Sequence, residues 1–137
     1  MRYPVKLKPE SGGFVVTFPD VPGAITEGDS RPEALCHALD ALETMFMYIF
    51  GTGEKIPLPS PLKPRQAWVE VPPTVAAKIL LHNEMVRQKV RPIELARRMG
   101  VPRQEVTRVL NLRHNTKIDT TAQALHALGK RLELNVA

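Results

Sequence analysis

The sequence holds a single cysteine, Cys36, and lacks the segments that would direct the chain out of the cytoplasm. Because a lone thiol has no partner within the chain, an internal disulfide framework is excluded. No apolar run approaches the roughly 20 residues of a membrane-spanning helix, and the N-terminus lacks the apolar core of a signal peptide. These absences predict a cytoplasmic protein.

Patterns typical of catalysis or metal binding are also scarce. Cys36 and His37 are adjacent, so their side chains point in different directions on a helix, and no histidine has a second ligand at metal spacing. Ser60 stands among prolines without an evident partner base. We therefore expect no catalytic residue, no metal site and no cofactor. The four histidines are His37, His82, His114 and His126.

The charges are distributed unevenly over the chain. Residues 1–70 contain seven Lys and Arg against nine Asp and Glu, whereas residues 71–137 contain twelve against five. A basic surface indicates a polyanion partner, because phosphate contacts supply most of the sequence-independent affinity for nucleic acid. The asymmetry favours two small domains, of which the acidic one needs a different partner.

The first part of the chain predicts a small sheet followed by a helix. Residues 3–8 and 14–18 flank a Gly-rich turn and predict a hairpin, and residues 24–27 predict a short third strand. Ser30 and Glu33 have the spacing of a capping box, so a helix should begin there and end near Gly51 or Gly53. Its sheet-facing residues are expected to be Leu35, Leu39, Leu42, Phe46 and Ile49.

A proline-rich segment follows this helix. Residues 56–64 contain four prolines, which exclude a helix and favour an extended chain. Residues 67–71 regain strand character and can return to the sheet as a fourth strand. We therefore place the domain boundary near Val71, with one domain at 1–71 and the other at 72–137.

The second domain is expected to be helical. Apolar spacing predicts a helix over residues 73–88 and another over 120–129, with Gly129 as its C-cap. Residues 132–136 alternate between apolar and polar and predict an edge strand, which can pair across a dimer.

Residues 92–111 (PIELARRMGVPRQEVTRVLN) have the pattern of a helix-turn-helix. Ala96 is small enough for the close approach of two helices, Gly100 can take the left-handed conformation that ends the first helix, and Val106 supplies a buried face. In such a motif the second helix, here 102–111, enters the major groove with its N-terminal residues facing the base edges. DNA binding by a dimer is therefore predicted.

Two groups of residues are predicted to contact DNA. Arg can pair with guanine and Gln with adenine, so residues in the first turns of the second helix are candidates to read bases. Side chains and backbone amides that follow the helix would meet phosphates. A solvent-exposed polar face is the alternative. The first group is Arg103, Gln104, Thr107 and Arg108, and the second is Arg113, His114, Asn115, Thr116 and Lys117.

Three segments resemble one known family. Residues 18–23 (FPDVPG) and 26–30 (TEGDS), followed by Glu33 and Ala34, resemble the N-terminal signature of HicB-type antitoxins. Residues 56–61 (IPLPSP) resemble the segment that follows in members with an added DNA-binding domain, and the C-terminal motif is similar to their Cro and phage-repressor type of helix-turn-helix. The resemblance spans nearly the whole chain in matching order.

This resemblance implies a fold and a function. The fold would be α+β, with a partly formed ribonuclease-H-like β-β-β-α-β domain used for binding, followed by an all-α DNA-binding domain. The partner would be a HicA-type toxin, a ribonuclease that cuts messenger RNA with a catalytic histidine, which the antitoxin masks. The DNA-binding domain would repress its own operon as a homodimer, with scope for higher toxin–antitoxin assemblies.

The acidic charge of the first domain fits a toxin that grips RNA and is therefore basic. Complementary charge would mainly speed association, while buried apolar surface would give most of the affinity. No family motif fixes the contact residues. The candidates to face the toxin are Glu27, Asp29, Glu33 and Glu43.

Two other functions remain open from the sequence. A free-standing helix-turn-helix regulator would use its first domain to sense a ligand or to oligomerise, and it predicts a pocket within the first 70 residues. A magnesium-dependent nuclease would use Asp20, Glu27 or Asp29. Turn formation and helix capping are the favoured interpretation of these carboxylates.

Overall fold

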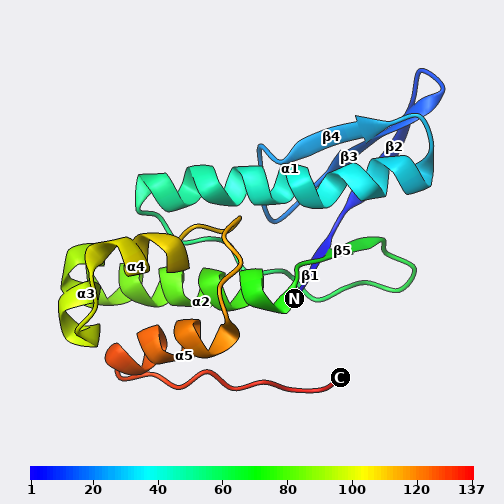
Figure 1. The fold of residues 1–137 in the computed structure, drawn as a ribbon. Helices are drawn as coiled ribbons and strands as arrows, with labels where there is room; N and C mark the ends of the chain where they lie inside the picture. The colour runs from blue at the N-terminus through cyan, green and yellow to red at the C-terminus, as the bar shows by residue number, and fades with distance from the viewer. The chain divides into compact units, whose positions relative to one another are not determined.

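The computed structural model describes residues 1–137 and has an α+β architecture (Figure 1). Its contacts divide the chain into two compact units. The N-terminal unit comprises residues 1–52 and 56–72, and the C-terminal unit comprises residues 53–55 and 73–137. None of the helices combines the length and the apolar character needed to cross a membrane.

The strands of the N-terminal unit form two small antiparallel sheets. One sheet has the order β2-β3-β4, and in the other β1 pairs with β5. The strands are β1 (Arg2–Pro4), β2 (Lys6–Glu10), β3 (Gly13–Thr17), β4 (Ile25–Gly28) and β5 (Trp68–Glu70).

The sequence predicted a single first strand over residues 3–8 and a fourth strand over residues 67–71 in the same sheet. The structure instead has two strands in the first segment, and the last strand belongs to a separate sheet. The first strand is divided at Val5, whose N–H donates to the carbonyl of Ala67 at 3.0 Å. The chain therefore pairs with β5 before Val5 and with β3 after it. Alternation of side chains predicts a strand but carries no information on its partner, which is why the sequence missed this division.

Helix α1 (Arg31–Thr52) begins as the capping box predicts. The N–H of Glu33 donates to Ser30 Oγ at 3.2 Å, and the Glu33 carboxylate accepts from the N–H of Asp29 at 2.7 Å. Glu33 thus reaches one residue further back than the standard capping box. The helix ends at Thr52, next to Gly53, which has φ of 75°.

The buried face of α1 differs from the expected one at its start. Ala34 and Ala38 are buried there, while Leu35 and Leu39 are only half-buried. The cause is the close approach of α1 to β4, since a Cβ at Gly28 would lie 2.4 Å from the backbone nitrogen of Ala34. Small side chains are needed at such a contact. The expected Leu42, Phe46 and Ile49 are buried.

The proline-rich segment is held to the N-terminal unit by side chains. The Tyr3 hydroxyl donates to the carbonyl of Pro57 at 2.7 Å, and its ring lies 5.4 Å from that of Phe46. Asp20 accepts from Ser60 twice, from the backbone N–H at 2.8 Å and from Oγ at 2.6 Å. The segment contains no helix, as the prolines predicted.

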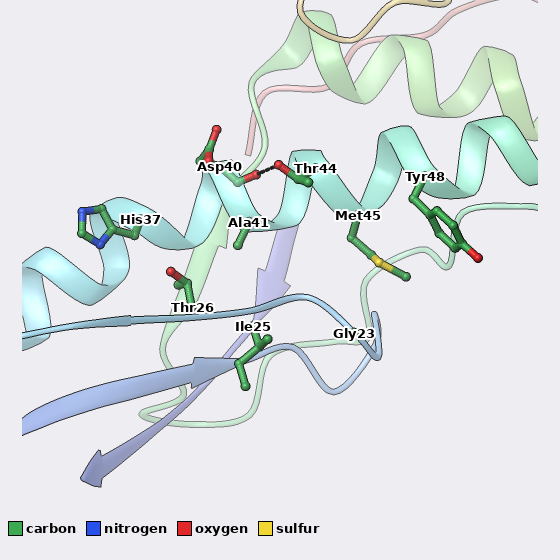
Figure 2. A pocket seen from close by; sticks show the side chains of 9 residues that line it. All are labelled: Gly23, Ile25, Thr26, His37, Asp40, Ala41, Thr44, Met45 and Tyr48. Carbon is green, nitrogen blue, oxygen red and sulfur yellow. Dashed lines mark hydrogen bonds between the residues drawn. The ribbon is translucent and has the colours of Figure 1, made fainter. Parts of the chain in front are cut away.

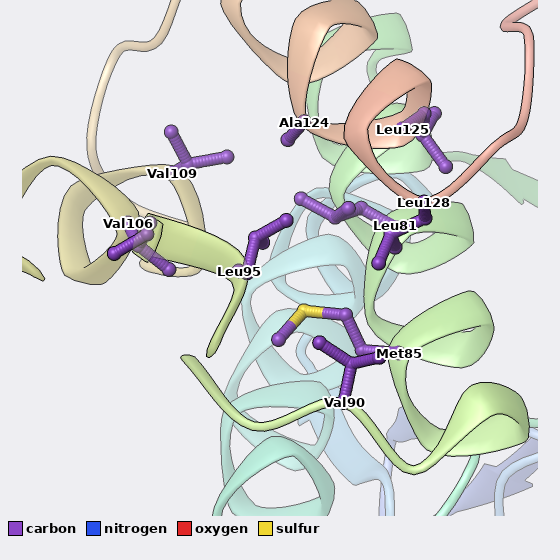
Figure 3. Packing of buried hydrophobic residues seen from close by; sticks show 10 residues of the cluster. Leu81, Met85, Val90, Leu95, Val106, Val109, Ala124, Leu125 and Leu128 are labelled. Carbon is purple, nitrogen blue, oxygen red and sulfur yellow. The ribbon is translucent and has the colours of Figure 1, made fainter. Parts of the chain in front are cut away.

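The C-terminal unit consists of four helices around one apolar core (Figure 3). Leu81 and Met85 of α2, Leu95 of α3, Val106 of α4 and Leu125 of α5 contribute to that core. The helices are α2 (Pro73–Gln88), α3 (Pro92–Met99), α4 (Arg103–Val109) and α5 (Ile118–Ala127).

The tail after α5 corrects a further expectation, since residues 130–137 contain no strand. Leu134 and Val136 are exposed. A strand requires a hydrogen-bonded neighbour, and this segment has none within the single chain.

Candidate nucleic-acid interface and acidic surface

The turn between α3 and α4 is built around Gly100, as the sequence predicted. Gly100 ends α3 in the left-handed conformation, with φ of 69° and ψ of 33°. Its N–H donates to the carbonyl of Arg97 at 3.2 Å, and the N–H of Val101 donates to Ala96 at 3.1 Å. These bonds satisfy the last carbonyls of α3, so that α4 can begin at Arg103.

Helix α4 separates an apolar face from a polar one. Val106 and Val109 are buried in the core of the C-terminal unit (Figure 3). The four side chains predicted to read bases all remain exposed, so the helix presents an uninterrupted polar surface to solvent. They are Arg103, Gln104, Thr107 and Arg108.

The segment after α4 curls back to form a hollow of about 190 Å³ beside that polar surface. The hollow brings Arg108 together with Lys117, although nine positions separate them in the chain. The other predicted contacts, Arg103, Gln104, Thr107 and Arg113, do not line it. The lining residues are Glu105, Arg108, Val109, His114, Asn115, Thr116, Lys117 and Thr120.

Thr116 is placed differently from the other predicted contacts. Its side chain is only 6% exposed, and its Oγ1 lies 3.0 Å from Nδ1 of His114. The hydroxyl therefore organises the loop from inside, whereas His114, Asn115 and Lys117 are exposed. A threonine among polar residues gives no sign of burial in the sequence.

The arginines of the C-terminal unit differ in how far their charge is compensated. Arg97 and Arg98 both form ion pairs with Glu94. Hydrogen bonds from these two guanidinium groups lower the pKa of Glu94 to about 2. Arg103 and Arg108 form no ion pair, so their charge is available to a partner.

One charged residue that sequence reasoning missed lies beneath this surface. Lys78 of α2 is 1% exposed, and its Nζ donates to backbone carbonyls at the end of α4 and in the following loop. The helical pattern of α2 rests on its apolar residues alone, and a lysine on a buried face is rare. Lys78 lies three positions after Val75 and three before Leu81, which places it on the same face of the helix as these buried residues. That spacing was the signal in the sequence that could have indicated its burial.

Several acidic residues of the N-terminal unit lie at the end of the β2-β3 hairpin. Glu27 and Asp29 line a hollow of about 300 Å³ there, together with Glu10. Glu33 belongs to the same end through its bond to Asp29, while Glu43 lies three helical turns further along α1. Glu10 was missed because only the strand register brings it opposite Gly13, beside β4.

A second hollow of the N-terminal unit, of about 450 Å³, lies between α1 and the chain that enters β4 (Figure 2). Met45 of α1 points toward Gly23, and Tyr48 stands beyond it. Ile25 and Tyr48 are exposed, at 61% and 66%. On α1, the Thr44 hydroxyl donates to the carbonyl of Asp40 at 2.8 Å.

The carboxylates considered for a nuclease lie at two different places in the N-terminal unit. Asp20 is engaged by Ser60, as described above, and lies at the proline-rich segment. Glu27 and Asp29 lie at the hairpin end. No group of three or more His, Cys, Asp and Glu side chains is arranged to hold a metal ion.

The structure thus defines a protein with a negatively charged N-terminal unit and a positively charged C-terminal unit. Residues 53–55 belong to the C-terminal unit, and the charges of Glu54 and Lys55 cancel each other. The net charge of each unit is therefore the same as the net charge counted from the sequence for the two parts of the chain. Both charged surfaces lie on exposed side chains rather than in a deep enclosed cleft, which is typical of recognition between macromolecules.

Comparison with known proteins identifies the family. A model of the HicB-like antitoxin of bacterial toxin–antitoxin systems matches residues 2–80. The chain is 53% identical over 137 residues to Antitoxin HicB 1 of Photorhabdus laumondii, covering 99% of this chain and 87% of the relative. It is 50% identical over 135 residues to Antitoxin HicB of Escherichia coli K12, covering 98% of each chain. A third relative, Antitoxin HicB of Pseudomonas fluorescens, is 33% identical over 136 residues, 98% of this chain and 93% of its own.

The chain belongs to the HicB-like antitoxin family. Membership makes it an antitoxin of a toxin–antitoxin system and implies a toxin partner. The resemblance inferred from residues 18–23 and 56–61 is confirmed at this level.

Proposed function

We propose that this antitoxin binds and masks a HicA-type ribonuclease toxin through its N-terminal unit and represses its own operon through its C-terminal unit. It acts by binding and not as an enzyme. On this proposal the N-terminal unit is a partly formed ribonuclease-H-like domain, and α3 and α4 are the two helices of a helix-turn-helix.

The observation that best supports DNA binding is the exposed polar face of α4 next to the turn at Gly100. Gly100 sets the turn and Val106 fixes the buried face, so Arg103, Gln104 and Thr107 point away from the core. An arginine and a glutamine in the first turn of an exposed helix match the side chains that recognise guanine and adenine in the major groove. The following loop adds Lys117 for phosphates.

The toxin-binding half is supported by the charge and exposure of the hairpin end. Glu27 and Asp29 offer exposed carboxylates there, with Glu10 alongside. A toxin that holds RNA must present basic residues, and complementary charge would steer the two proteins together. We retain Glu33 and Glu43 as contact candidates, although the carboxylate of Glu33 also caps α1.

Dimerisation is proposed for the C-terminal unit, because two paired helix-turn-helix motifs are needed to read two half-sites. The tail at residues 131–137 has no strand partner within the chain, and its Leu134 and Val136 are exposed. Pairing of two such tails as antiparallel strands would cover both side chains. Analytical ultracentrifugation of the full chain and of a chain ending at residue 130 tests this, since the shorter chain should sediment as a monomer.

Co-expression tests the antitoxin function. Expressed alone, the small reading frame beside this gene should arrest growth, and expression of the present chain should restore it. The two products should also purify together. If growth is not restored while both proteins accumulate, the proposal is wrong for this chain.

The hollow beside α1 favours one alternative, a free-standing regulator whose N-terminal unit senses a small ligand (Figure 2). Its size lies within the range of small-molecule pockets. This alternative predicts no toxic neighbour, and it predicts that a metabolite extract changes the affinity of the chain for its promoter.

A further inference from the structure

Lys78 is the one lysine of the C-terminal unit whose ammonium group is turned inward. It lies in the middle of α2 and is 1% exposed. Its Nζ lies 2.7 Å from the carbonyl of Asn111, 2.7 Å from that of His114 and 3.4 Å from that of Arg108. Three backbone carbonyls therefore converge on one buried cation.

Such a group is costly to bury, so its partners must compensate it. Removal of an ammonium from water is unfavourable unless each of its donors finds an acceptor. Lys78 finds three acceptors, and one of them, the Arg108 carbonyl, belongs to the last turn of α4, where the partial negative charge of the helix favours a cation. Burial nevertheless lowers the pKa of Lys78.

The carbonyls also belong to the segment that carries the proposed phosphate contacts. Within the segment Asn111 accepts the N–H of Arg113 on Oδ1 at 3.0 Å, and its carbonyl accepts the N–H of His114 at 3.1 Å. These short bonds hold each residue to its neighbour. Lys78 ties the end of α4 and the loop to a different helix, α2.

From this geometry we infer that Lys78 is a positioning residue for DNA binding. It does not contact DNA, and it fixes the loop over residues 111–117 against α2 so that His114, Asn115 and Lys117 stand beside α4. The inference rests on the proposed DNA-binding function. It differs from a contribution to stability alone, because the loop has to be in place before its side chains can meet phosphates together.

The test compares Lys78→Met with Met85→Ala in the full chain. Lys78→Met keeps an unbranched side chain as far as Cε but removes the ammonium and its donors. Met85→Ala removes a buried side chain of the same helix that belongs to the apolar core. Both variants should lose thermal stability. Measurements are made at a temperature where circular dichroism shows wild type and variants equally folded.

We expect only Lys78→Met to change binding to the gene's own promoter. Hydrogen exchange should speed up for the amides of residues 111–117, and promoter affinity should fall about tenfold, as for a loss near 1.4 kcal/mol. The slope of log affinity against log salt should flatten by about 0.9 for each phosphate that the variant no longer neutralises. Met85→Ala should retain the wild-type slope and the wild-type exchange rates in the loop.

A measurement on the wild type covers the case in which Lys78→Met does not fold. The Lys78 ammonium should give a slowly exchanging nitrogen resonance, which should shift when promoter DNA is added, because the loop carbonyls respond to the bound phosphates. An unshifted resonance, alongside shifted loop amides, would overturn the inference. So would a folded Lys78→Met with wild-type affinity and salt slope, or an equal loss of affinity in Met85→Ala.

Failure of the underlying function has a different signature. If the wild-type chain itself shows no preference for its promoter over random DNA, then the proposed DNA-binding function is wrong, whatever the variants do. If the wild type binds with preference and the Lys78 variant is unchanged, only the positioning role is wrong.

Discussion

At the scale of single residues, base contacts and phosphate contacts can be told apart by mutation. Arg103 and Gln104 of α4 are exposed and are the proposed base contacts. Arg103→Ala or Gln104→Ala should lower the preference for the operator, since a good bidentate pair contributes roughly 1 to 3 kcal/mol of discrimination. The loss should be small on random DNA. A gel-shift series on the gene's own promoter and on a scrambled duplex measures the difference.

Lys117→Ala serves as the matched comparison, because its ammonium is exposed and lies in the loop beside α4. It should weaken binding to all sequences alike and reduce the salt slope by about 1. If Arg103→Ala behaves in the same way, with equal losses on operator and random DNA, Arg103 does not read a base.

The residue pattern predicted exposure correctly on α4, and in the loop after it for every candidate except Thr116. Arg103 and Gln104 sit on a short helix whose valines fix the orientation, so the pattern determines which side chains face solvent. Thr116 and Lys78 lie where the fold of the loop decides burial. Helical spacing places Lys78 on the buried face of α2, but its acceptors lie 30 or more positions away in the chain. The Thr116 bond runs within an irregular segment, which helical spacing does not describe.

At the scale of elements, the packing of α1 on β4 depends on Gly28. A Cβ there would lie 2.4 Å from the nitrogen and 2.7 Å from the Cα of Ala34, which are backbone atoms that cannot move alone. Gly28→Ala should therefore displace α1 and destabilise the N-terminal unit by at least about 2 kcal/mol, in the range of overpacked cores. Urea unfolding followed by circular dichroism measures this.

Gly51→Ala is the control for that variant. Gly51 lies in the last turn of α1 and has nothing within 4 Å of the position of an added Cβ. Alanine has the higher helix propensity, so this substitution should be neutral or stabilising by up to about 1 kcal/mol. Equal destabilisation by both substitutions would contradict the close-packing explanation.

Helix α3 should be sensitive to acid through Glu94. Its folded-state pKa of about 2 is below the ordinary value of 4.5, because Arg97 and Arg98 donate to its carboxylate. The stability that it contributes is therefore fully present above about pH 4.5 and is lost as the pH falls toward 2. The melting temperatures of wild type and Glu94→Gln should differ most above pH 4.5 and converge near pH 2.

That measurement needs the variant as a reference, because Glu84 also has a pKa lowered to about 2, through hydrogen bonds from Arg87 and Gln88. Acid weakens both ion pairs in the wild type, and only the difference from Glu94→Gln isolates α3. A melting-temperature difference that does not change with pH would contradict the role assigned to the ion pair.

The elements themselves were predicted where local chemistry decides them. Ser30 and Glu33 gave the start of α1, and Gly100 gave the end of α3. The pairing of β5 with β1 and the division at Val5 depend on contacts between distant segments, which alternation of side chains does not encode. The tail at residues 132–136 has the alternation of a strand but no neighbour to pair with.

At the scale of the whole molecule, the charges divide the two proposed tasks between the units. The exposed carboxylates Glu27 and Asp29 lie in the N-terminal unit, and the uncompensated Arg103 and Arg108 lie in the C-terminal unit. Substitutions in separate units that share no partners are expected to act independently. Toxin neutralisation and promoter binding should therefore be separable by mutation.

Two full-length double variants test this separation. Arg103→Ala with Lys117→Ala should still restore growth in cells that express the neighbouring toxin, while repression of a reporter fused to the promoter is abolished. Glu27→Gln with Asp29→Asn should keep repression and slow the association with the toxin, most clearly at low salt, where exposed charges are least screened.

The second variant also distinguishes an antitoxin from a free-standing regulator. In a regulator, neutral side chains at the hairpin end would leave every measured function unchanged, because no basic partner docks there. In an antitoxin, stopped-flow mixing with purified toxin should give a lower association rate than wild type at low salt, and the difference should shrink as salt is added. If the variant associates at the wild-type rate at every salt concentration, the acidic surface is not part of the toxin interface. The exposed apolar residues of the hollow beside α1, Ile25 and Tyr48, would then be the next residues to substitute.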